Sequence, residues 1–357
     1  MRYYTYWKVR CMALNGELIT IIIPVYNGEQ FIDRCFQRLL QQTYQKFVII
    51  AVDDGSTDHS VEMLDSWEQK DNRIHVIHTE NHGVSAARNA GMSYALSKFQ
   101  VGYYHFHDVD DYLDLEGYEK LIKLIQENKY PDIVLFGKNT VWLDKQGKQT
   151  RSEVTIPEFS GYLNRQELIT RYYEYYGIHK GVRNTVWNKL FSRHIAEKVA
   201  FREDLTIAED VFYCIDALAL ADSLLVVPES FYTYCSQSSP KAYYDADVQI
   251  SYDRDLEIKN KVVAMGVDEK KAEDEYYHQV LYTAYNHCML TLRSKNPTVK
   301  DAVNDIINKL NRLETKKQLE GMRFSERIIK IASTLPTKEL RFFFLEAVRL
   351  SVKTLRG

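Results

Sequence analysis

The chain has 357 residues, 45% of them apolar, which is enough to bury the core of one large domain or of two ordinary ones. Its formal net charge of −3 argues against a nucleic-acid-binding protein, and no apolar run reaches the roughly 18 residues that a membrane span needs. Five cysteines, none of them in a CxxC pair, favour a reducing compartment over a disulfide framework or a zinc site.

The N-terminal stretch MRYYTYWKVRCMALNGELIT carries early basic residues but lacks the apolar core of a signal peptide. We expect residues 1–17 to form an extension ahead of the first domain. Met1 and Met12 both remain candidates for the true start.

Strand and helix patterns alternate over the first 137 residues. ITIIIPVYN is a β-branched run interrupted by Pro24, which predicts a strand buried on both faces, and EQFIDRCFQRLLQQT has the apolar spacing of a helix. Further strands are predicted in FVIIAVDD, RIHVIH, VGYYHFHDVDD and DIVLFG. Further helices are predicted in HSVEMLDSWEQ (capped by Asp58), GVSAARNAGMSYALSKF and LEGYEKLIKLIQEN. The alternation predicts an α/β domain with a mostly parallel, doubly wound sheet.

The alternation weakens after about residue 137. We predict a helix over GYLNRQELITRYYEYYG, a helix from near Thr206 in LTIAEDVFYCIDALALAD, and one or two strands in SLLVVPESFYTY. From about residue 245 the pattern is helical only.

The C-terminal end is basic. Fourteen basic and 7 acidic residues lie between Lys295 and Gly357, so this end carries +7 and the remainder of the chain −10. The basic amphipathic segment ELRFFFLEAVRLSVKTLRG is typical of a helix on an anionic membrane surface. The alternative is a helix that packs its apolar side on the rest of the protein or on a second subunit.

Polar clusters follow four of the predicted strands: Tyr26-Asn27, Asp53-Asp54, His82-Gly83 and Asp108 to Asp111. Ligands of doubly wound sheets bind beyond the carboxyl ends of the strands. We therefore expect the four clusters to share one site.

The cluster HDVDD places three carboxylates within four positions, and a bound cation would relieve their mutual repulsion. Mg²⁺ and Mn²⁺ take one or two protein carboxylates together with phosphate oxygens. The alternative is a plain strand end with Asp111 as a helix cap. Val109 is expected to point away from the site. His105 and His107 are expected to be packed strand residues rather than metal ligands.

Three positions have a functional and a structural interpretation each. A carboxylate of the Asp53-Asp54 pair can accept the imide N–H of a uracil, or the pair can belong to an Asx-turn followed by a helix cap. Tyr26 can offer its ring face to a base, or be a buried tyrosine with a satisfied hydroxyl. Arg88 can pair with a diphosphate, or be a surface arginine on a helix.

Glu209 and Asp210 open the helix that follows the predicted sheet. Acidic residues in a first helical turn complement the helix dipole, which accounts for at least one of the two. The functional alternative is a general base within hydrogen-bond reach of an acceptor hydroxyl.

Six segments occur in the order IIIPVYNGEQFI, VDDGSTD, NHGVSAARNAG, HDVDDYL, WNKLF and AEDVFY. Together they resemble the family 2 glycosyltransferases, which have the GT-A fold, over roughly residues 18–235. The resemblance implies a metal-dependent, inverting enzyme of the hexosyltransferase class. It would move a sugar from a UDP-sugar to a hydroxyl of a glycan or lipid-linked acceptor in cell-surface or capsular polysaccharide synthesis.

Two alternatives stay open beside this interpretation. One is a non-catalytic protein that binds a nucleotide-sugar. The other, less favoured, is a nucleotidyltransferase, because PVYNGEQ has neither a Gly-rich phosphate loop nor basic residues.

The resemblance also implies roles for individual residues. Asp110 would ligate Mn²⁺ or Mg²⁺, Asp210 would be the catalytic base, and Glu209 would neighbour it. The acceptor side would be shaped by Trp187, Asn188 and Lys189. The nucleotide-sugar would be bound by Pro24, Tyr26, Asp53, Asp54, Asn81, Arg88 and Asp108.

The expected organisation is a GT-A domain over residues 18–239 followed by a helical region over residues 240–357. The domain divides into a nucleotide-sugar half, residues 18–137, and an acceptor half, residues 138–239. We expect no nucleic-acid partner and a cytoplasmic location. Peripheral contact with the inner face of the membrane and homo-oligomerisation remain open.

Overall fold

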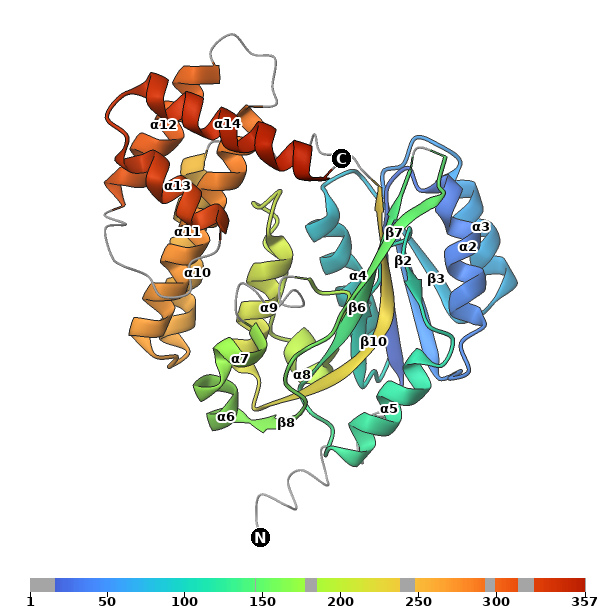
Figure 1. Ribbon diagram of the computed structural model, residues 1–357. Coiled ribbons are helices and arrows are strands. Elements are labelled where there is room, and N and C mark those ends of the chain that lie inside the picture. Colours follow the sequence, from blue (N-terminus) through green and yellow to red (C-terminus); the bar gives the residue numbers. More distant parts are fainter. Residues whose placement is uncertain are drawn as a thin grey trace. The chain divides into compact units, whose positions relative to one another are not determined.

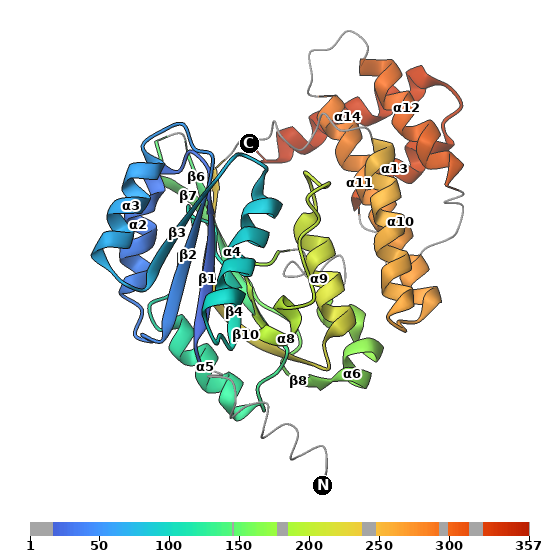
Figure 2. The same ribbon diagram turned by 180° about the vertical axis from the view of Figure 1, so that it is seen from behind.

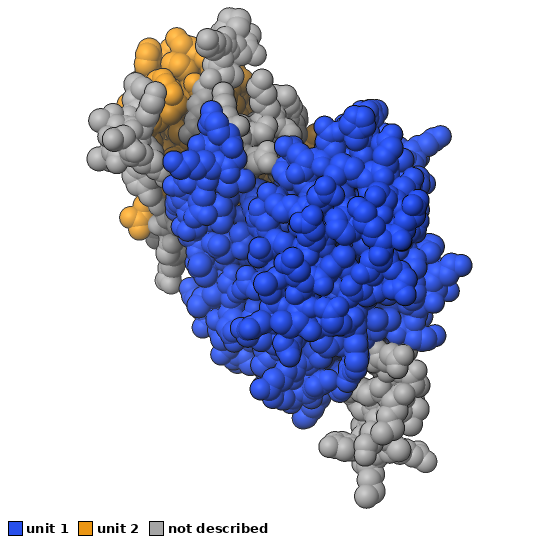
Figure 3. Space-filling model, turned by 90° about the vertical axis from the view of Figure 1, so that its right-hand side faces the viewer, with its two compact units in different colours: residues 1–238 blue, residues 239–357 orange. Residues whose placement is uncertain are grey.

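The computed structural model describes residues 17–144, 146–176, 185–237, 248–292, 299–313 and 324–356. The chain forms two compact units, residues 1–238 and residues 239–357 (Figure 3). Both candidate starts and the predicted boundary at residues 239–240 lie outside the described residues, as does all but the last residue of the predicted extension.

The first unit is built on one ten-stranded sheet (Figure 1). Its strands are β1 (Ile19–Val25), β2 (Phe47–Asp54), β3 (Ile74–Thr79), β4 (Tyr103–Phe106), β5 (Tyr112–Leu113), β6 (Ile133–Leu143), β7 (Gln149–Thr155), β8 (Gly161–Asn164), β9 (Lys189–Ser192) and β10 (Ser223–Gln237). The order is β3-β2-β1-β4-β9-β6-β10-β5, with β7 beside β6 and β8 beside β10.

Strands β3, β2, β1 and β4 run parallel to one another, and β10 runs parallel to β6. Strand β9 lies antiparallel between β4 and β6, which joins the two groups into a single sheet. The predicted α/β class with a mostly parallel central sheet is confirmed.

Helices cover both faces of the parallel strands. Helices α2 (Glu29–Leu40) and α3 (Ser60–Lys70) lie on one face, and α4 (Val84–Lys98) lies on the other (Figures 1 and 2). Because side chains alternate along a strand, Ile21 packs in the core under α2 and α3, whereas Ile22 faces α4. Helix α4 approaches closely at Gly91, where an added Cβ would lie 2.8 Å from Ile22 Cγ2. The predicted burial of β1 on both faces follows from this arrangement.

Other helices of the first unit are α5 (Gly117–Glu127), α6 (Arg165–Thr170), α7 (Tyr172–Tyr176), α8 (Arg193–Ala196) and α9 (Glu209–Leu220). The single helix predicted over residues 161–177 is wrong at its start, because Gly161–Asn164 form β8 and pair with β10. The helix predicted from near Thr206 begins at Glu209, because Ala208 adopts the left-handed conformation with φ 69°.

The boundary predicted between residues 137 and 138 falls inside β6. The strand continues because β10 pairs with it on both sides of that point. The two predicted halves therefore share one strand rather than meeting at a linker.

The second unit is helical, as predicted. Its helices are α10 (Val248–Ala264), α11 (Glu269–Thr291), α12 (Val299–Arg312), α13 (Phe324–Thr334) and α14 (Lys338–Arg356). Its core forms around α11, whose buried Leu281, Ala284 and Cys288 meet Ile307 of α12 and Ile329 of α13. Within the described residues of the whole chain, every helix is too short or too polar to pass through a bilayer.

Candidate active site

The loops that follow β1 and β2 hold each other in place. Asn27, at φ 50°, accepts a hydrogen bond from the Thr57 backbone N–H at 2.8 Å and donates its own N–H to Ser56 Oγ at 3.0 Å. Glu29 accepts from the His59 N–H at 3.0 Å, and Asp58 accepts from the Glu29 N–H at 3.2 Å. The loops that carry the first two predicted polar clusters are thus joined by hydrogen bonds between backbone N–H groups and side-chain oxygens.

The turn after β2 positions the loop after β3. The two carboxylate oxygens of Asp54 accept the backbone N–H groups of His82 and Gly83, each at 2.9 Å. Gly55 has φ 71°, and an added Cβ there would lie 2.7 Å from the Asn81 backbone nitrogen. Only glycine adopts this positive φ without strain and also leaves room for the Asn81 nitrogen. Gly55 therefore allows the loop after β3 to approach this turn closely.

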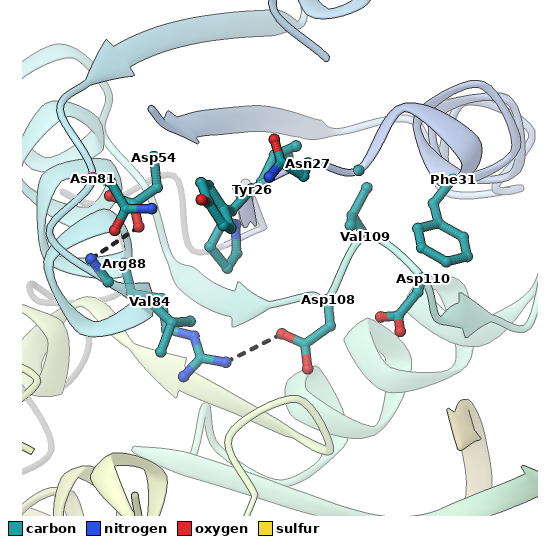
Figure 4. A pocket seen from close by; sticks show the side chains of 14 residues that line it. Tyr26, Asn27, Phe31, Asp54, Asn81, Val84, Arg88, Asp108, Val109 and Asp110 are labelled. Atoms are coloured by element: carbon teal, nitrogen blue, oxygen red, sulfur yellow. Dashed lines mark hydrogen bonds and ion pairs between the residues drawn. The ribbon is translucent and has the colours of Figure 1, made fainter. Parts of the chain in front are cut away.

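These loops surround a cavity of about 550 Å³ (Figure 4). Its volume lies in the range of small-molecule sites. Seven of the predicted residues line it: Pro24, Tyr26, Asp54, Asn81, Arg88, Asp108 and Asp110. Asn27 and Gly83, which belong to the predicted polar clusters, line it as well. The lining residues that sequence reasoning did not assign to the site are Val25, Gly28, Phe31, Val84 and Val109.

Tyr26 is 53% exposed and lines the cavity, so the alternative of a buried tyrosine is excluded. One expectation about a single residue is wrong. Val109 was expected to point away from the site, yet its side chain lines the cavity (Figure 4). Strand β4 ends at Phe106, so the alternation of faces no longer applies at Val109, and the missing side chain of Gly28 leaves it room.

Arg88 is the centre of an ion-pair cluster. Its Nη1 lies 2.6 Å from Asp210 Oδ1 and 3.3 Å from Glu209 Oε1, and its Nη2 lies 3.1 Å from Asp108 Oδ1. Arg88 is only 3% exposed, so the alternative of a surface arginine is wrong. A diphosphate that paired with Arg88, as predicted, would have to share the guanidinium with these three carboxylates.

The cluster shifts the ionisation of its members. Burial alone would lower the pKa of Arg88, but its carboxylate partners, Asp210 first, outweigh burial and hold that pKa above its ordinary value. Burial raises the pKa of Asp210 to about 7, against the opposing effect of Arg88 and with help from the neighbouring charges of Glu209 and Asp108. A carboxylate with a pKa near neutrality suits proton transfer at physiological pH.

The three carboxylates of the acidic motif have separate environments. Asp108 pairs with Arg88, and Asp111 is buried and accepts the Cys235 backbone N–H at 2.8 Å. Asp110 lines the cavity, and burial together with the charge of Asp108 raises its pKa to about 6. Of the three, Asp110 is the one whose charge faces the cavity without a salt bridge among the described residues.

A hard divalent cation fits this position. The neighbouring charge and partial burial that raise the pKa of Asp110 would both be offset by a cation. Among the described residues no cluster of three or more His, Cys, Asp or Glu side chains could hold a metal alone. That is compatible with Mg²⁺ or Mn²⁺, which take one or two carboxylates and complete their shell with water and phosphate oxygens.

His105 and His107 are both packed, as predicted, although β4 ends at Phe106 and His107 follows it. His105 is fully buried, with Nδ1 at 2.6 Å from the Tyr118 hydroxyl and Nε2 at 2.7 Å from the Trp187 carbonyl oxygen. Burial lowers the pKa of His105 to about 3, and the ring of His107 packs edge-on against Tyr232. Neither histidine lines the cavity.

Asp53 and the predicted acceptor residues lie away from the cavity. Asp53 is buried behind the turn, where it accepts the Ser56 N–H at 3.1 Å. Trp187 stacks between Tyr232 and Tyr234, at 4.7 and 5.4 Å. Asn188 and Lys189 are buried, and Asn188 Oδ1 accepts from Lys189 Nζ at 3.0 Å. The ligand-binding roles of these residues remain predictions.

The family model described as Glycosyl transferase family 2 matches residues 20–198. A curated relative, the uncharacterized glycosyltransferase EpsJ of Bacillus subtilis, is 33% identical over 61% of this chain and 60% of its own length. Glycosyltransferase GlyA of Streptococcus pneumoniae is 29% identical over 62% of this chain and 31% of its own length. The chain thus matches less than two thirds of each relative.

Solved structures share the fold. Residues 1–349 of S. aureus TarS, in complex with UDP, superpose with a TM-score of 0.62 at 17% identity, over 93% of this chain and 91% of that one. The same TarS segment in complex with UDP-GlcNAc also gives 0.62, at 16% identity, over 95% and 91%. This likeness supports the predicted GT-A fold.

A mostly parallel sheet with a polar cavity beyond the carboxyl ends of its strands is the arrangement in which doubly wound α/β proteins bind their ligands. The chain belongs to glycosyl transferase family 2.

Proposed function

We propose that the protein is a metal-dependent, inverting glycosyltransferase that moves a sugar from a UDP-sugar to an acceptor hydroxyl. The observation that carries this proposal is the Arg88 cluster, in which one buried guanidinium joins the cavity carboxylate Asp108 to Asp210, a carboxylate with a pKa near 7. Such a link would join donor-binding and proton-accepting groups in one network.

The donor base would occupy the part of the cavity next to Asp54 and Asn81. Asp54 uses both oxygens for backbone N–H groups, and an ionised carboxylate has further lone pairs for the imide N–H of uracil. The exposed ring of Tyr26 offers a face for stacking. TarS, which is similar in fold, has been solved with UDP and with UDP-GlcNAc, which supports a uridine nucleotide as the first donor to test.

Asp110 would hold Mn²⁺ or Mg²⁺, and Asp108 would face the ribose or the sugar. A metal ion bound there would stabilise negative charge on the diphosphate leaving group. Arg88 would keep Asp108 in place while remaining near that charge.

Asp210 would take the proton of the acceptor hydroxyl, whose oxygen attacks the anomeric carbon from the face opposite the leaving group. Ala208, in the left-handed conformation, sets the direction in which α9 presents Glu209 and Asp210. Backbone strain of this kind is often found at functional positions.

The acceptor would be a glycan or a lipid-linked glycan used in surface polysaccharide synthesis. Leu340 and Phe343 are 49% and 60% exposed and lie three residues apart on one side of α14. Lys300 Nζ lies 5.4 Å from the Phe343 ring centroid, and α14 contains five basic and two acidic residues. Exposed apolar side chains among basic ones suit an anionic lipid surface, so we propose peripheral membrane contact through α14.

Thermal unfolding with UDP, in the presence and absence of Mn²⁺, tests the donor site. A ligand at 100 times its Kd adds about 2.7 kcal/mol to stability. We expect a shift in Tm that needs both UDP and Mn²⁺. A shift with another nucleotide alone would change the donor class, and no shift with any nucleotide would overturn the proposal. Sugar transfer from a panel of UDP-sugars then separates an enzyme from a non-catalytic binder.

A further inference from the structure

His78 lies on β3, outside the cavity, between two carboxylates. Its Nδ1 is 3.3 Å from Asp53 Oδ2 on β2, and its Nε2 is 3.0 Å from Asp65 Oδ1 on α3. A neutral imidazole has one N–H and can donate to one carboxylate only, whereas the imidazolium donates to both. The geometry therefore matches the cationic form of His78.

Asp53, the buried partner of His78, organises the turn after β2. Its Oδ1 accepts the Ser56 backbone N–H at 3.1 Å, and its carbonyl oxygen accepts from Thr79 Oγ1 at 3.0 Å. Ser56 Oγ in turn accepts the backbone N–H of Asn27. Two hydrogen bonds, both made by Ser56, thus connect the carboxylate that His78 contacts with the backbone of Asn27.

The same turn positions two more cavity residues. Asp54 belongs to the turn itself, and Gly55 lies directly against the backbone nitrogen of Asn81. Asn27, Asp54 and Asn81 all line the cavity (Figure 4). A displacement of the turn would therefore move three lining residues, among them Asp54 and Asn81, which we propose to lie next to the nucleotide base.

We infer that His78 is a positioning residue which, as a cation, holds the Asp53 turn against α3 and so sets the affinity for the donor nucleotide rather than the rate of transfer. We call the contacts of His78 with Asp53 and Asp65 the clamp. The expected effect on nucleotide affinity rests on the proposed function, whereas the existence of the clamp does not. Its strength should fall as pH rises and His78 loses its charge.

The charged groups around His78 agree with this direction. Among the described residues, β2 and α3 pack on β3 here. They contribute Asp53 and Asp65 at the ring and Glu68, which accepts the Val76 N–H at 2.9 Å. Burial lowers the pKa of His78, but the hydrogen bonds that its ring donates to Asp65 and Asp53 outweigh burial and raise the pKa above its ordinary value of 6.5. The clamp should be complete below that pH and weaken as pH passes through the raised pKa.

The first test needs no ligand. Amide hydrogen exchange of residues 53–57 and 79–83, corrected for intrinsic rates, should show stronger protection at pH 6 than at pH 8 in the wild type. His78→Gln should remove that difference. His75→Gln is the matched control, because His75 lies on the same strand against the rings of Tyr94 and Phe99. Equal protection at both pH values in the wild type would overturn the inference.

The second test measures the consequence. Calorimetric titration with UDP and Mn²⁺ should show that His78→Gln binds about two- to fivefold more weakly at pH 6, as expected for a partly exposed ion pair, with the gap closing by pH 8. The kcat at saturating donor should stay unchanged. Unaltered affinity, or a fall in kcat alone, would overturn the positioning role. If the wild type binds no uridine nucleotide but the exchange effect is present, the proposed donor is wrong and the clamp stands.

Discussion

Arg88 Nη1 lies 2.6 Å from Asp210 Oδ1, although the two residues are 122 positions apart in the chain. The other terminal nitrogen of the same guanidinium lies 3.1 Å from Asp108. Helix α4, the end of β4 and the start of α9 are therefore held together at one buried charge. The predictions below follow from this cluster, from the loops around the cavity and from the surface of the second unit.

Replacing Asp210 with asparagine should reduce turnover by about 10²–10⁴-fold, because the amide cannot accept the proton of the acceptor hydroxyl. UDP binding should remain, because Asp210 does not line the cavity. Initial rates and calorimetric affinities measured on the same preparation check both statements. Asp222→Asn, an exposed position just after the same helix, is the control and should have no effect. If Asp210→Asn retains its turnover, the catalytic base is another residue.

The pH profile of kcat/KM should rise through about pH 7 and level off above it. The pKa of Asp210 in the unliganded protein is raised to about 7, chiefly by burial, and only the ionised carboxylate accepts a proton. The negative charge of Asp108 contributes to the raised pKa of Asp210. Asp108→Asn should therefore shift the rising part of the pH profile to lower pH. A profile flat from pH 5.5 to 8 would contradict the assignment.

Asp110→Ala should abolish the part of UDP binding that depends on Mn²⁺. Loss of the carboxylate removes the group best placed to hold the cation, while the base-binding residues stay intact. Thermal shifts with UDP alone and with UDP plus Mn²⁺ measure the two parts separately. Asp114→Ala, an exposed carboxylate four positions later, should behave as the wild type. If Asp110→Ala still binds UDP in a metal-dependent way, the metal is held by other residues.

Gly55→Ala should destabilise the first unit and weaken nucleotide binding. The new Cβ would lie 2.7 Å from the Asn81 nitrogen, in addition to a left-handed φ that costs about 1–2 kcal/mol. Gly147→Ala measures the cost of the left-handed φ alone, because Gly147 has φ 77° and an added Cβ would meet nothing within 4 Å. Urea unfolding should show the larger loss for Gly55→Ala. Equal losses would mean that Asn81 can move aside.

Leu340→Ser combined with Phe343→Ser should abolish binding to vesicles that contain phosphatidylglycerol. Neutral phosphatidylcholine vesicles should bind the wild type weakly, because the basic charge of α14 then has no partner. Ile250→Ser is the matched control, since Ile250 is similarly exposed but lies on α10. Co-sedimentation checks this. No binding by the wild type would refute the contact, and loss of a dimer in the double variant would assign the surface to a second copy.

Some of the site could be predicted because local sequence patterns determine it. Each polar cluster directly follows an apolar strand, and parallel strands bring their carboxyl ends to one edge, so Tyr26, Asp54 and Asp110 share a cavity. The burial of Arg88 could not be predicted, since its partners lie 20, 121 and 122 positions away. Nothing local marks a helical arginine as the centre of an ion cluster.

Other residues were misjudged where a local pattern stopped. Val109 was placed by strand alternation, which ends with β4 at Phe106. The segment from Gly161 has helical composition, but β10 recruits it as β8 through main-chain pairing that side-chain periodicity does not reveal. In both places long-range backbone pairing, or the loss of it, overrides the local preference.

Strand β9 has a mechanical consequence. It is hydrogen-bonded to β4 on one side and to β6 on the other, so one uninterrupted sheet crosses from the strands under the cavity to those of the later part of the first unit. A hinge between these parts would have to break main-chain hydrogen bonds in the middle of a buried sheet. For the proposed activity we therefore expect ligands to enter and leave by movement of the loops over a rigid sheet, and inhibitors that immobilise those loops should act without altering the sheet.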